Sequence, residues 1–119
     1  MIGPDLSDIS DSDLAKLSAA MNVLAATGNK IGGDLFHLVE QQVCYRDGET
    51  PGRYEITHVE AHTDLDLANM ICALAVIIEA GRDSGQDDDH PLQQFFLWAS
   101  TILLNEAERR GMMAGTMLQ

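Results

Sequence analysis

Residues 67–78 form an almost unbroken apolar segment, which is interrupted only by Asn69. Its large side chains recur at steps of three and four residues, the period of an α-helix. They are Leu67, Met70, Ile71, Leu74, Ile77 and Ile78. The segment has 12 residues, whereas a membrane span needs about 20. A helix that is apolar on nearly all sides lies at the centre of its fold or between subunits. The segment therefore predicts a helical protein that forms a homodimer.

The rest of the chain predicts an all-α fold, a small bundle of about four helices in one domain over residues 1–119. Hydrophobic spacing and local end signals place the helices. They are expected at Ser12–Thr27, Ile31–Tyr45, Asp64–Gly81 and Leu92–Arg110. Residues 36–39 could be a strand, although a helix fits the segment better. We expect a flexible N-terminal segment over residues 1–11, a short extended piece near Tyr54–Ile56 and an apolar tail over residues 112–119.

Several residues have the chemistry of helix ends. For the first helix we expect one of Ser10, Asp11 and Ser12 to be the N-cap. The side-chain oxygen of such a residue accepts a hydrogen bond from a free backbone amide of the first turn. Asp34 follows the pair Gly32-Gly33 and is expected to cap the second helix. Thr63 and Asp66 have the spacing of a capping box, and Pro91 suits the first position of the last helix. Glycines are expected to end the helices at Gly28, Gly81 and Gly111.

Charge and composition exclude several classes of partner. The chain carries 7 Lys plus Arg and 19 Asp plus Glu, a formal net charge of −12. DNA, RNA and anionic membranes are themselves negative and would repel it. Its N-terminus lacks the basic and apolar regions of a secretion signal, so we expect a cytoplasmic protein. Cys44 and Cys72 are expected to be reduced thiols in apolar surroundings.

The histidine pair at positions 58 and 62 is the sharpest candidate for chemistry. Glu55 and His58 have the Glu-x-x-His spacing of di-iron bundles, but the chain lacks a second copy. A zinc-protease motif needs Glu after the first His, where this chain has Val59. Asp87–Asp89 lacks the spacing of a calcium loop. We therefore expect no catalytic residue, no metal and no cofactor, and we do not expect an enzyme.

The C-terminal third of the chain has more apolar residues than one helix face can bury. Aromatic anchors and flexible methionines are typical of protein-binding surfaces. The residues predicted to contact a partner are Phe95, Phe96, Trp98, Ile102, Leu104, Met112, Met113 and Met117. The alternative is that the aromatics belong to the core and that the tail packs back onto the bundle. A second hypothesis is an acidic inhibitor that mimics DNA, although the acids gather in the N-terminal segment and in residues 83–89.

Two segments carry a resemblance to a known family. They are the isoleucine-rich residues 71–81, ICALAVIIEAG, and the aromatic residues 91–99, PLQQFFLWA. With the length and acidity of the whole chain, they resemble the QslA-like quorum-sensing antiactivators of pseudomonads. The resemblance implies a homodimer that binds the ligand-binding domain of a LuxR-type transcription factor. It also implies that the protein covers the dimerisation surface of that factor and keeps it off DNA, without catalytic residues.

Overall fold

The computed structural model describes residues 3–4, 6, 9–46, 56 and 58–112. It confirms the all-α prediction, with four α-helices, one short 3-10 helix and no strand among the described residues. The elements are α1 (Asp11–Ala26), α2 (Lys30–Arg46), η1 (Val59–Ala61), α3 (Asp64–Asp83) and α4 (Pro91–Arg109). Of the extended piece expected near Tyr54–Ile56, Ile56 lies outside any helix and packs against the core. Tyr54 lies outside the described residues.

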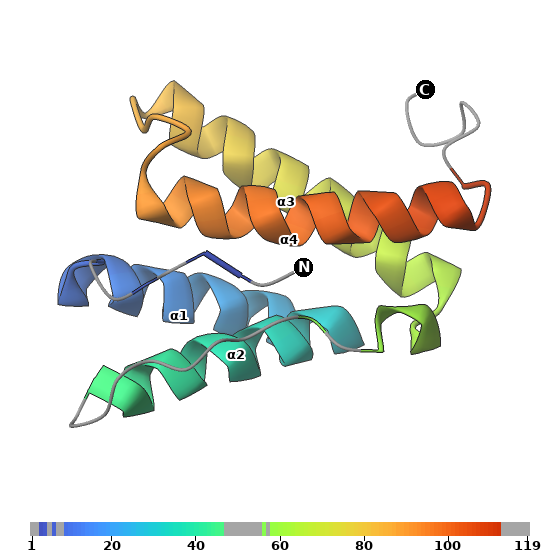
Figure 1. The fold of residues 1–119 in the computed structure, drawn as a ribbon, viewed down its shortest axis with the longest axis horizontal. Coiled ribbons are helices and arrows are strands. Elements are labelled where there is room, and N and C mark those ends of the chain that lie inside the picture. The colour runs from blue at the N-terminus through green and yellow to red at the C-terminus, as the bar shows by residue number, and fades with distance from the viewer. Residues whose placement is uncertain (1–2, 5, 7–8, 47–55, 57, 113–119) are drawn as a thin grey trace.

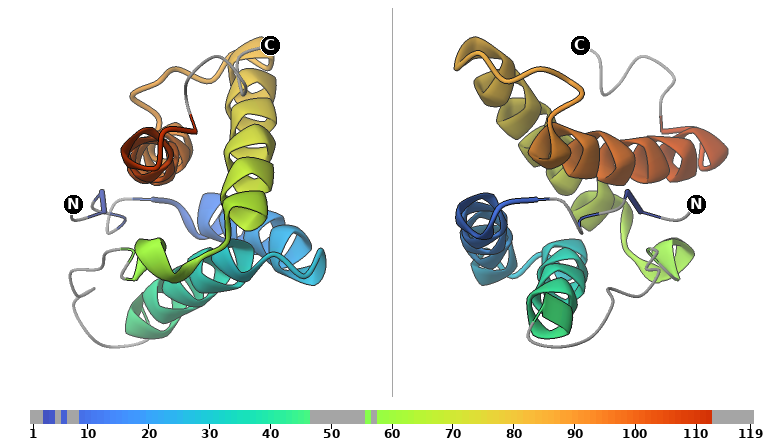
Figure 2. Two further views of the ribbon diagram at one scale, coloured as in Figure 1. Left: turned by 90° about the vertical axis from the view of Figure 1, so that its right-hand side faces the viewer. Right: turned by 60° about the vertical axis from the view of Figure 1, so that its left-hand side comes forward.

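The helices form two hairpins. Helix α1 packs along α2, and α3 packs along α4, while α2 and α3 connect the two hairpins. Figure 1 shows the α1–α2 hairpin below the α3–α4 hairpin, and Figure 2 shows the same arrangement from two other sides. Leu6 and Ile9, which precede α1, are part of the hydrophobic core.

Three of the four helix starts agree with the predicted caps. Ser10 Oγ accepts a hydrogen bond from the Asp13 amide at 3.1 Å, and Thr63 Oγ1 accepts one from the Asp66 amide at 3.1 Å. At α4, His90 Nδ1 accepts from the Leu92 amide at 3.2 Å, and Pro91 occupies the first turn. These caps satisfy amides that have no partner inside the helix.

The prediction that Asp34 caps the second helix is wrong. Asn29 Oδ1 accepts hydrogen bonds from the amides of Ile31 at 2.9 Å and Gly32 at 3.3 Å. Gly32 and Gly33 are therefore part of α2. A Cβ atom on Gly32 would lie 2.8 Å from the carbonyl oxygen of Leu24. The glycine is needed because α1 and α2 approach backbone to backbone at this point.

Gly81 likewise lies inside α3 and does not end it. The helix continues to Asp83, and Gly85, with φ +93°, follows it in the left-handed conformation. A Cβ atom on Gly81 would lie 2.8 Å from Oε1 of Gln93, whose side chain is fully buried. A close contact between α3 and α4, and not a helix stop, explains this glycine.

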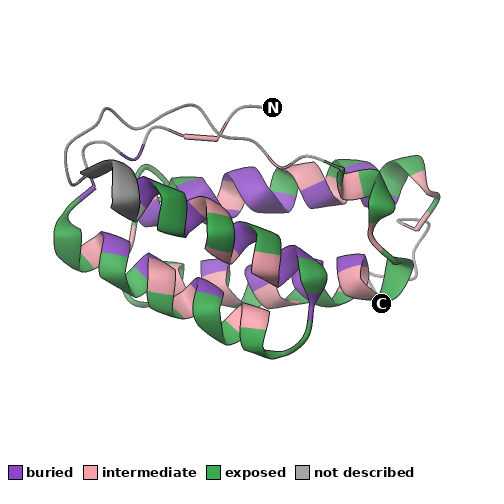
Figure 3. Cartoon of the chain, turned by 90° about the horizontal axis from the view of Figure 1, so that it is seen from below, coloured by how far each residue is buried: buried purple, intermediate pink, exposed green. Residues whose placement is uncertain are grey.

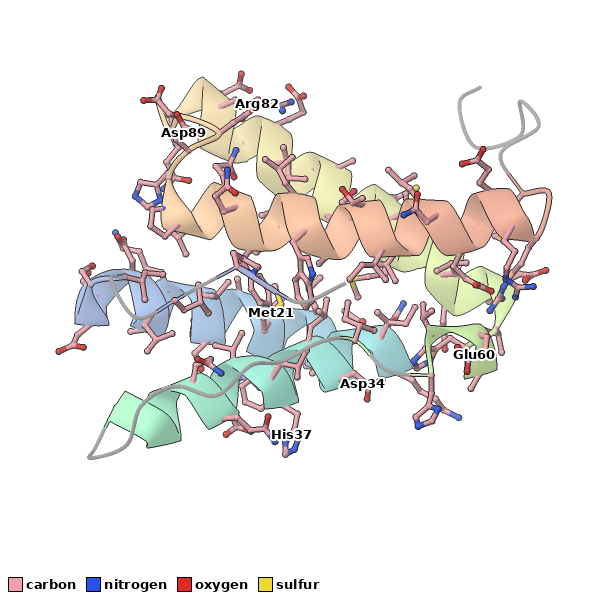
Figure 4. All side chains as sticks on the ribbon, viewed as in Figure 1. Met21, Asp34, His37, Glu60, Arg82 and Asp89 are labelled. Atoms are coloured by element: carbon pink, nitrogen blue, oxygen red, sulfur yellow. The ribbon has the colours of Figure 1, made fainter. Side chains whose placement is uncertain are left out.

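One hydrophobic core joins the two hairpins. Figure 3 shows how buried and exposed residues alternate along the helices. Met21 lies in the middle of the bundle (Figure 4) and is fully buried. Within the segment 1–11 that was expected to be flexible, Leu6 and Ile9 are only 2% and 3% exposed and belong to the core. These two apolar side chains gain more from burial than they lose in freedom. Within the described part of the chain, no helix combines the length and apolarity that crossing a membrane requires.

Candidate protein-interaction surface

Helix α3 has two apolar sides, and only one of them belongs to the core. The inner side is buried and consists of Leu67, Met70, Ile71, Leu74 and Ile78. The other side is exposed. We define the α3 outer face as Leu65, Asn69, Cys72, Ala75 and Val76, which are all exposed. Positions 65, 69, 72 and 76 alternate steps of four and three residues, so they form one stripe along the helix.

The outer face carries two of the most exposed large apolar residues in the described part of the chain. Leu65 and Val76 are each 69% exposed, and Val23 on α1 is 65% exposed. In the left view of Figure 2, α4 lies on one side of α3, and no helix lies on the other side along its C-terminal half. Cys72 is exposed on this stripe, so its predicted burial is wrong. The side chain of Cys44 lies outside the described residues.

A shallow hollow of about 330 Å³ borders the outer face near the start of α3. Leu24 and Thr27 line it from the end of α1, and Asn69 and Ala73 line it from α3. At its edge, the Asn29 side-chain amide donates to the carbonyl oxygen of Asp66 at 2.9 Å. The surface next to Asn69 is therefore concave and fixed by a hydrogen bond between the hairpins.

The aromatic residues predicted to anchor a partner lie in the core. Phe95 is fully buried, and Phe96 and Trp98 are only 5% and 7% exposed. The ring centroids of Phe95 and Phe96 are 6.0 Å apart at an interplanar angle of 80°, and those of Phe95 and Trp98 are 5.5 Å apart. Such edge-to-face contacts stabilise a packed interior. The interface role of these three aromatics is therefore corrected to a core role, the alternative left open by the sequence.

The other predicted interface residues divide into two groups. Ile102, Leu104 and Met112 are partly buried and pack against the core. They keep some exposed surface but do not form an apolar patch like that of α3. Met113 and Met117 lie outside the described residues. In the described part of α4, no residue that was predicted to contact a partner is well exposed.

A network of charges joins the end of α4 to the start of α3. Glu106 is 7% exposed and accepts hydrogen bonds from Arg109 Nε at 2.8 Å and Arg110 Nε at 2.6 Å. These bonds, first that of Arg109, lower the pKa of Glu106 from 4.5 to about 2. Arg110 also donates to Asp64 at 2.8 Å and to the carbonyl oxygen of Glu60 at 3.2 Å. The network fixes the end of the outer face that carries Leu65.

The two histidines singled out in the sequence lie in different surroundings. His62 Nε2 lies 3.0 Å from Asp34 Oδ2, which links the end of η1 to α2. His58 has a left-handed backbone, with φ +57°, and its side chain is 83% exposed. Figure 4 shows Asp34 and His37 projecting from α2 away from the α3–α4 hairpin. Among the described residues, no group of three or more His, Cys, Asp or Glu could hold a metal ion.

Acidic residues from two parts of the chain meet at the opposite end of the bundle. His90 Nε2 lies 3.6 Å from Asp13 Oδ2, which brings the start of α1 to the loop between α3 and α4. Arg82 Nε donates to Asp88 at 3.0 Å, and Arg82 also contacts Glu79 at 3.1 Å. Figure 4 shows Arg82 and Asp89 at this end. The C-terminal end of α3 therefore lies in an acidic region.

Comparisons with known proteins return no match, either to a family model, to a curated relative or to a solved structure. The candidate site therefore depends on the geometry of α3. Val76 was recognised in the sequence as part of a helix with little polar surface, but Leu65 was missed because it precedes the apolar segment. The spacing of 65, 69, 72 and 76, on the side opposite the core residues, is the signal that would have found the stripe.

Proposed function

We propose that this chain is a small regulatory protein that acts by binding another protein through the α3 outer face. The observation that carries the proposal is the exposure of Leu65 and Val76 on one stripe of an otherwise acidic molecule. Apolar side chains grouped on a surface mark a binding site more often than scattered ones do. The role needs no catalytic group and no cofactor.

The resemblance of residues 71–81 and 91–99 supplies a specific target. In that form of the proposal, the protein is an antiactivator that binds the ligand-binding domain of a LuxR-type transcription factor, in the cytoplasm. It covers the dimerisation surface of the factor, and the factor then no longer binds DNA. In the free protein the same face is available to a second copy, so we propose a homodimer that the target displaces.

Co-purification with the ligand-binding domain of a LuxR-type factor tests this function. We expect a complex that elutes as one species and a factor that no longer shifts its operator DNA. The double variant Leu65→Gln/Val76→Gln should abolish the complex, because it replaces both large apolar side chains of the stripe. Val23→Gln is the matched control, since Val23 is similarly exposed on another helix. Light scattering of the free chain should give twice 13.0 kDa.

The acidic end of the bundle favours one other function, inhibition of a nucleic-acid-binding protein by mimicry of DNA. His90, which directly follows Asp87–Asp89 in the sequence, lies 3.6 Å from Asp13 of α1. A partner bound this way would be held by charge and would be released by salt. Replacement of Asp87, Asp88 and Asp89 by Asn would weaken that complex and leave a complex through the α3 outer face almost intact.

A further inference from the structure

The α3 outer face has an uncharged centre. Residues 67–78 contain no Asp, Glu, Lys or Arg. Cys72 and Val76 are exposed along this part of the helix, with Asn69 as the polar residue of the stripe, and Leu65 precedes it between Asp64 and Asp66. Over this length the surface can exclude water against another apolar surface without burying a charge, which would be costly without a partner.

The two ends of the face differ in charge. At the N-terminal end, Arg110 contacts Asp64 at 2.8 Å and compensates one carboxylate. At the C-terminal end, residues 79–90 contain five carboxylates and one arginine. Glu79 and Asp83 follow Val76 by three and seven residues, so they continue the stripe. Arg82 is already paired with Glu79 and Asp88, which leaves this end strongly acidic.

We propose that the α3 outer face binds an amphipathic helix of its partner that has an apolar stripe and a cluster of Lys or Arg at one end. The apolar stripe covers Leu65 to Val76, and the basic cluster lies over Glu79 and Asp83. Helices that dock by an apolar face and are oriented by charges at their ends are a common mode of recognition. This inference rests on the proposed function, because it names the chemistry of the partner for the same surface.

Charge argues for such a partner over a second copy of this chain. A second copy presents the same acidic ends, and a two-fold contact places identical surfaces against each other. Its neighbouring Arg109 and Arg110 already pair with Glu106 and Asp64, so in the described part of the chain this pair is not available to lie over Glu79 and Asp83. A homodimer through this face is therefore opposed by repulsion, and a basic partner helix displaces it.

Three synthetic helical peptides test the inference on the full chain. They share one leucine stripe at heptad spacing and carry lysines, glutamines or glutamates at the same end. We expect the lysine peptide to bind about tenfold more tightly than the glutamine peptide at low salt, and the glutamate peptide to bind most weakly. The preference should shrink as the ionic strength rises past about 0.15 M, where screening acts over about 8 Å.

Two variants test whether Glu79 and Asp83 cause the preference for the lysine peptide and whether Leu65 and Val76 bind the leucine stripe. Glu79→Gln/Asp83→Asn should remove most of the difference between the lysine and glutamine peptides and keep the binding of the glutamine peptide. Leu65→Gln/Val76→Gln should abolish the binding of all three peptides, whereas Val23→Gln should bind as the wild type does. Circular dichroism and a melting curve confirm that each variant is folded before binding is measured.

The outcomes separate this inference from the proposed function. If the lysine and glutamate peptides bind equally and Leu65→Gln/Val76→Gln abolishes both, the basic partner is wrong and the binding face stands. If that variant binds every peptide as the wild type does, both proposals are wrong. If the free chain is a dimer at low salt and the lysine peptide neither binds it nor dissociates it, the face belongs to a second copy and the inference is overturned.

Discussion

The two helical hairpins are held together in different ways. Where α1 and α2 meet, Gly32 lets the backbones approach so closely that a Cβ atom would lie 2.8 Å from a carbonyl oxygen. In the α3–α4 hairpin the corresponding close contact, at Gly81, is with the buried side chain of Gln93 and not with backbone. Phe95 and Leu103 of α4 and Leu74 of α3 are all fully buried.

The two helices of the α3–α4 hairpin also differ in which of their apolar residues are buried in the core. Helix α4 contacts α3 and η1, and its side chains share one core with Leu6 and Ile9 from the N-terminal segment. Its aromatics are covered on more than one side. Helix α3 is covered on its inner side, and the large residues of its outer face remain exposed. Apolar residues on α4 therefore serve stability, whereas Leu65 and Val76 on α3 are free to serve binding.

The largest effect on stability is expected at the centre of the α3–α4 hairpin. Phe95→Ala should lower the free energy of unfolding by about 3–5 kcal/mol, because it removes a buried ring and leaves a cavity. Chemical denaturation monitored by circular dichroism measures the change. Leu97→Ala is the control in the same helix, since Leu97 is only partly buried. Equal costs for the two variants would show that Phe95 is not a core anchor.

The α1–α2 hairpin should be sensitive to a single added methyl group. Gly32→Ala forces a Cβ atom against the backbone of Leu24, and we expect a loss of about 1–3 kcal/mol of stability from overpacking. Gly33→Ala is the matched control, because a Cβ atom there meets nothing within 4 Å. That control should stabilise the helix by about 0.5–1 kcal/mol. Similar effects of the two substitutions would contradict the backbone contact.

The sequence predicted features that depend on local chemistry and missed those that depend on distant neighbours. The caps at Ser10 and Thr63 involve residues within three positions of each other, so the sequence contains the whole signal. Gly32 and Gly81 were interpreted as breaks in the helix. Their actual role depends on Leu24 and Gln93 across the hairpins, which local spacing does not reveal.

The apolar excess of α4 was interpreted as exposed surface for the same reason. The spacing in α4 placed Leu97, Trp98 and Leu104 outside the stripe that contains Phe95 and Phe96, but it could not show how many neighbours surround that helix. The excess apolar character of α3 was recognised, and the structure shows that its outer face is uncovered among the described residues. Hydrophobic spacing gives the number of apolar sides, whereas the fold decides which sides are covered.

The charge network that joins the end of α4 to the start of α3 should make stability depend on pH. Hydrogen bonds from Arg109 and Arg110 lower the pKa of Glu106 from 4.5 to about 2. The carboxylate therefore stabilises the folded chain fully above pH 4.5, and this stabilisation is lost as the pH falls from about 4.5 toward 2. The difference in melting temperature between the wild type and Glu106→Gln should shrink over that range.

Asp88 provides the comparison for that measurement. Its pKa is also lowered, by a hydrogen bond from Arg82, but both side chains of this pair are well exposed. Exposed ion pairs contribute little to stability. Asp88→Asn should therefore change the melting temperature much less than Glu106→Gln at neutral pH. A wild-type advantage over Glu106→Gln that persists at pH 2 would show that the ion pairs are not its source.

The smallest effect on stability is expected on the α3 outer face. Val76 is 69% exposed, so Val76→Gln removes little buried surface and introduces a residue that suits a helix. The free energy of unfolding should change by no more than about 0.5 kcal/mol. Denaturation of Val76→Gln beside Val23→Gln measures it, and both variants should unfold like the wild type. If Val76→Gln alone lowered the free energy of unfolding by several times that amount, Val76 would pack against other residues of the chain, and the outer face would belong to the core. A neutral result, together with a large loss at Phe95, would establish that the buried aromatics of α4 stabilise the fold whereas the outer face of α3 contributes little to stability.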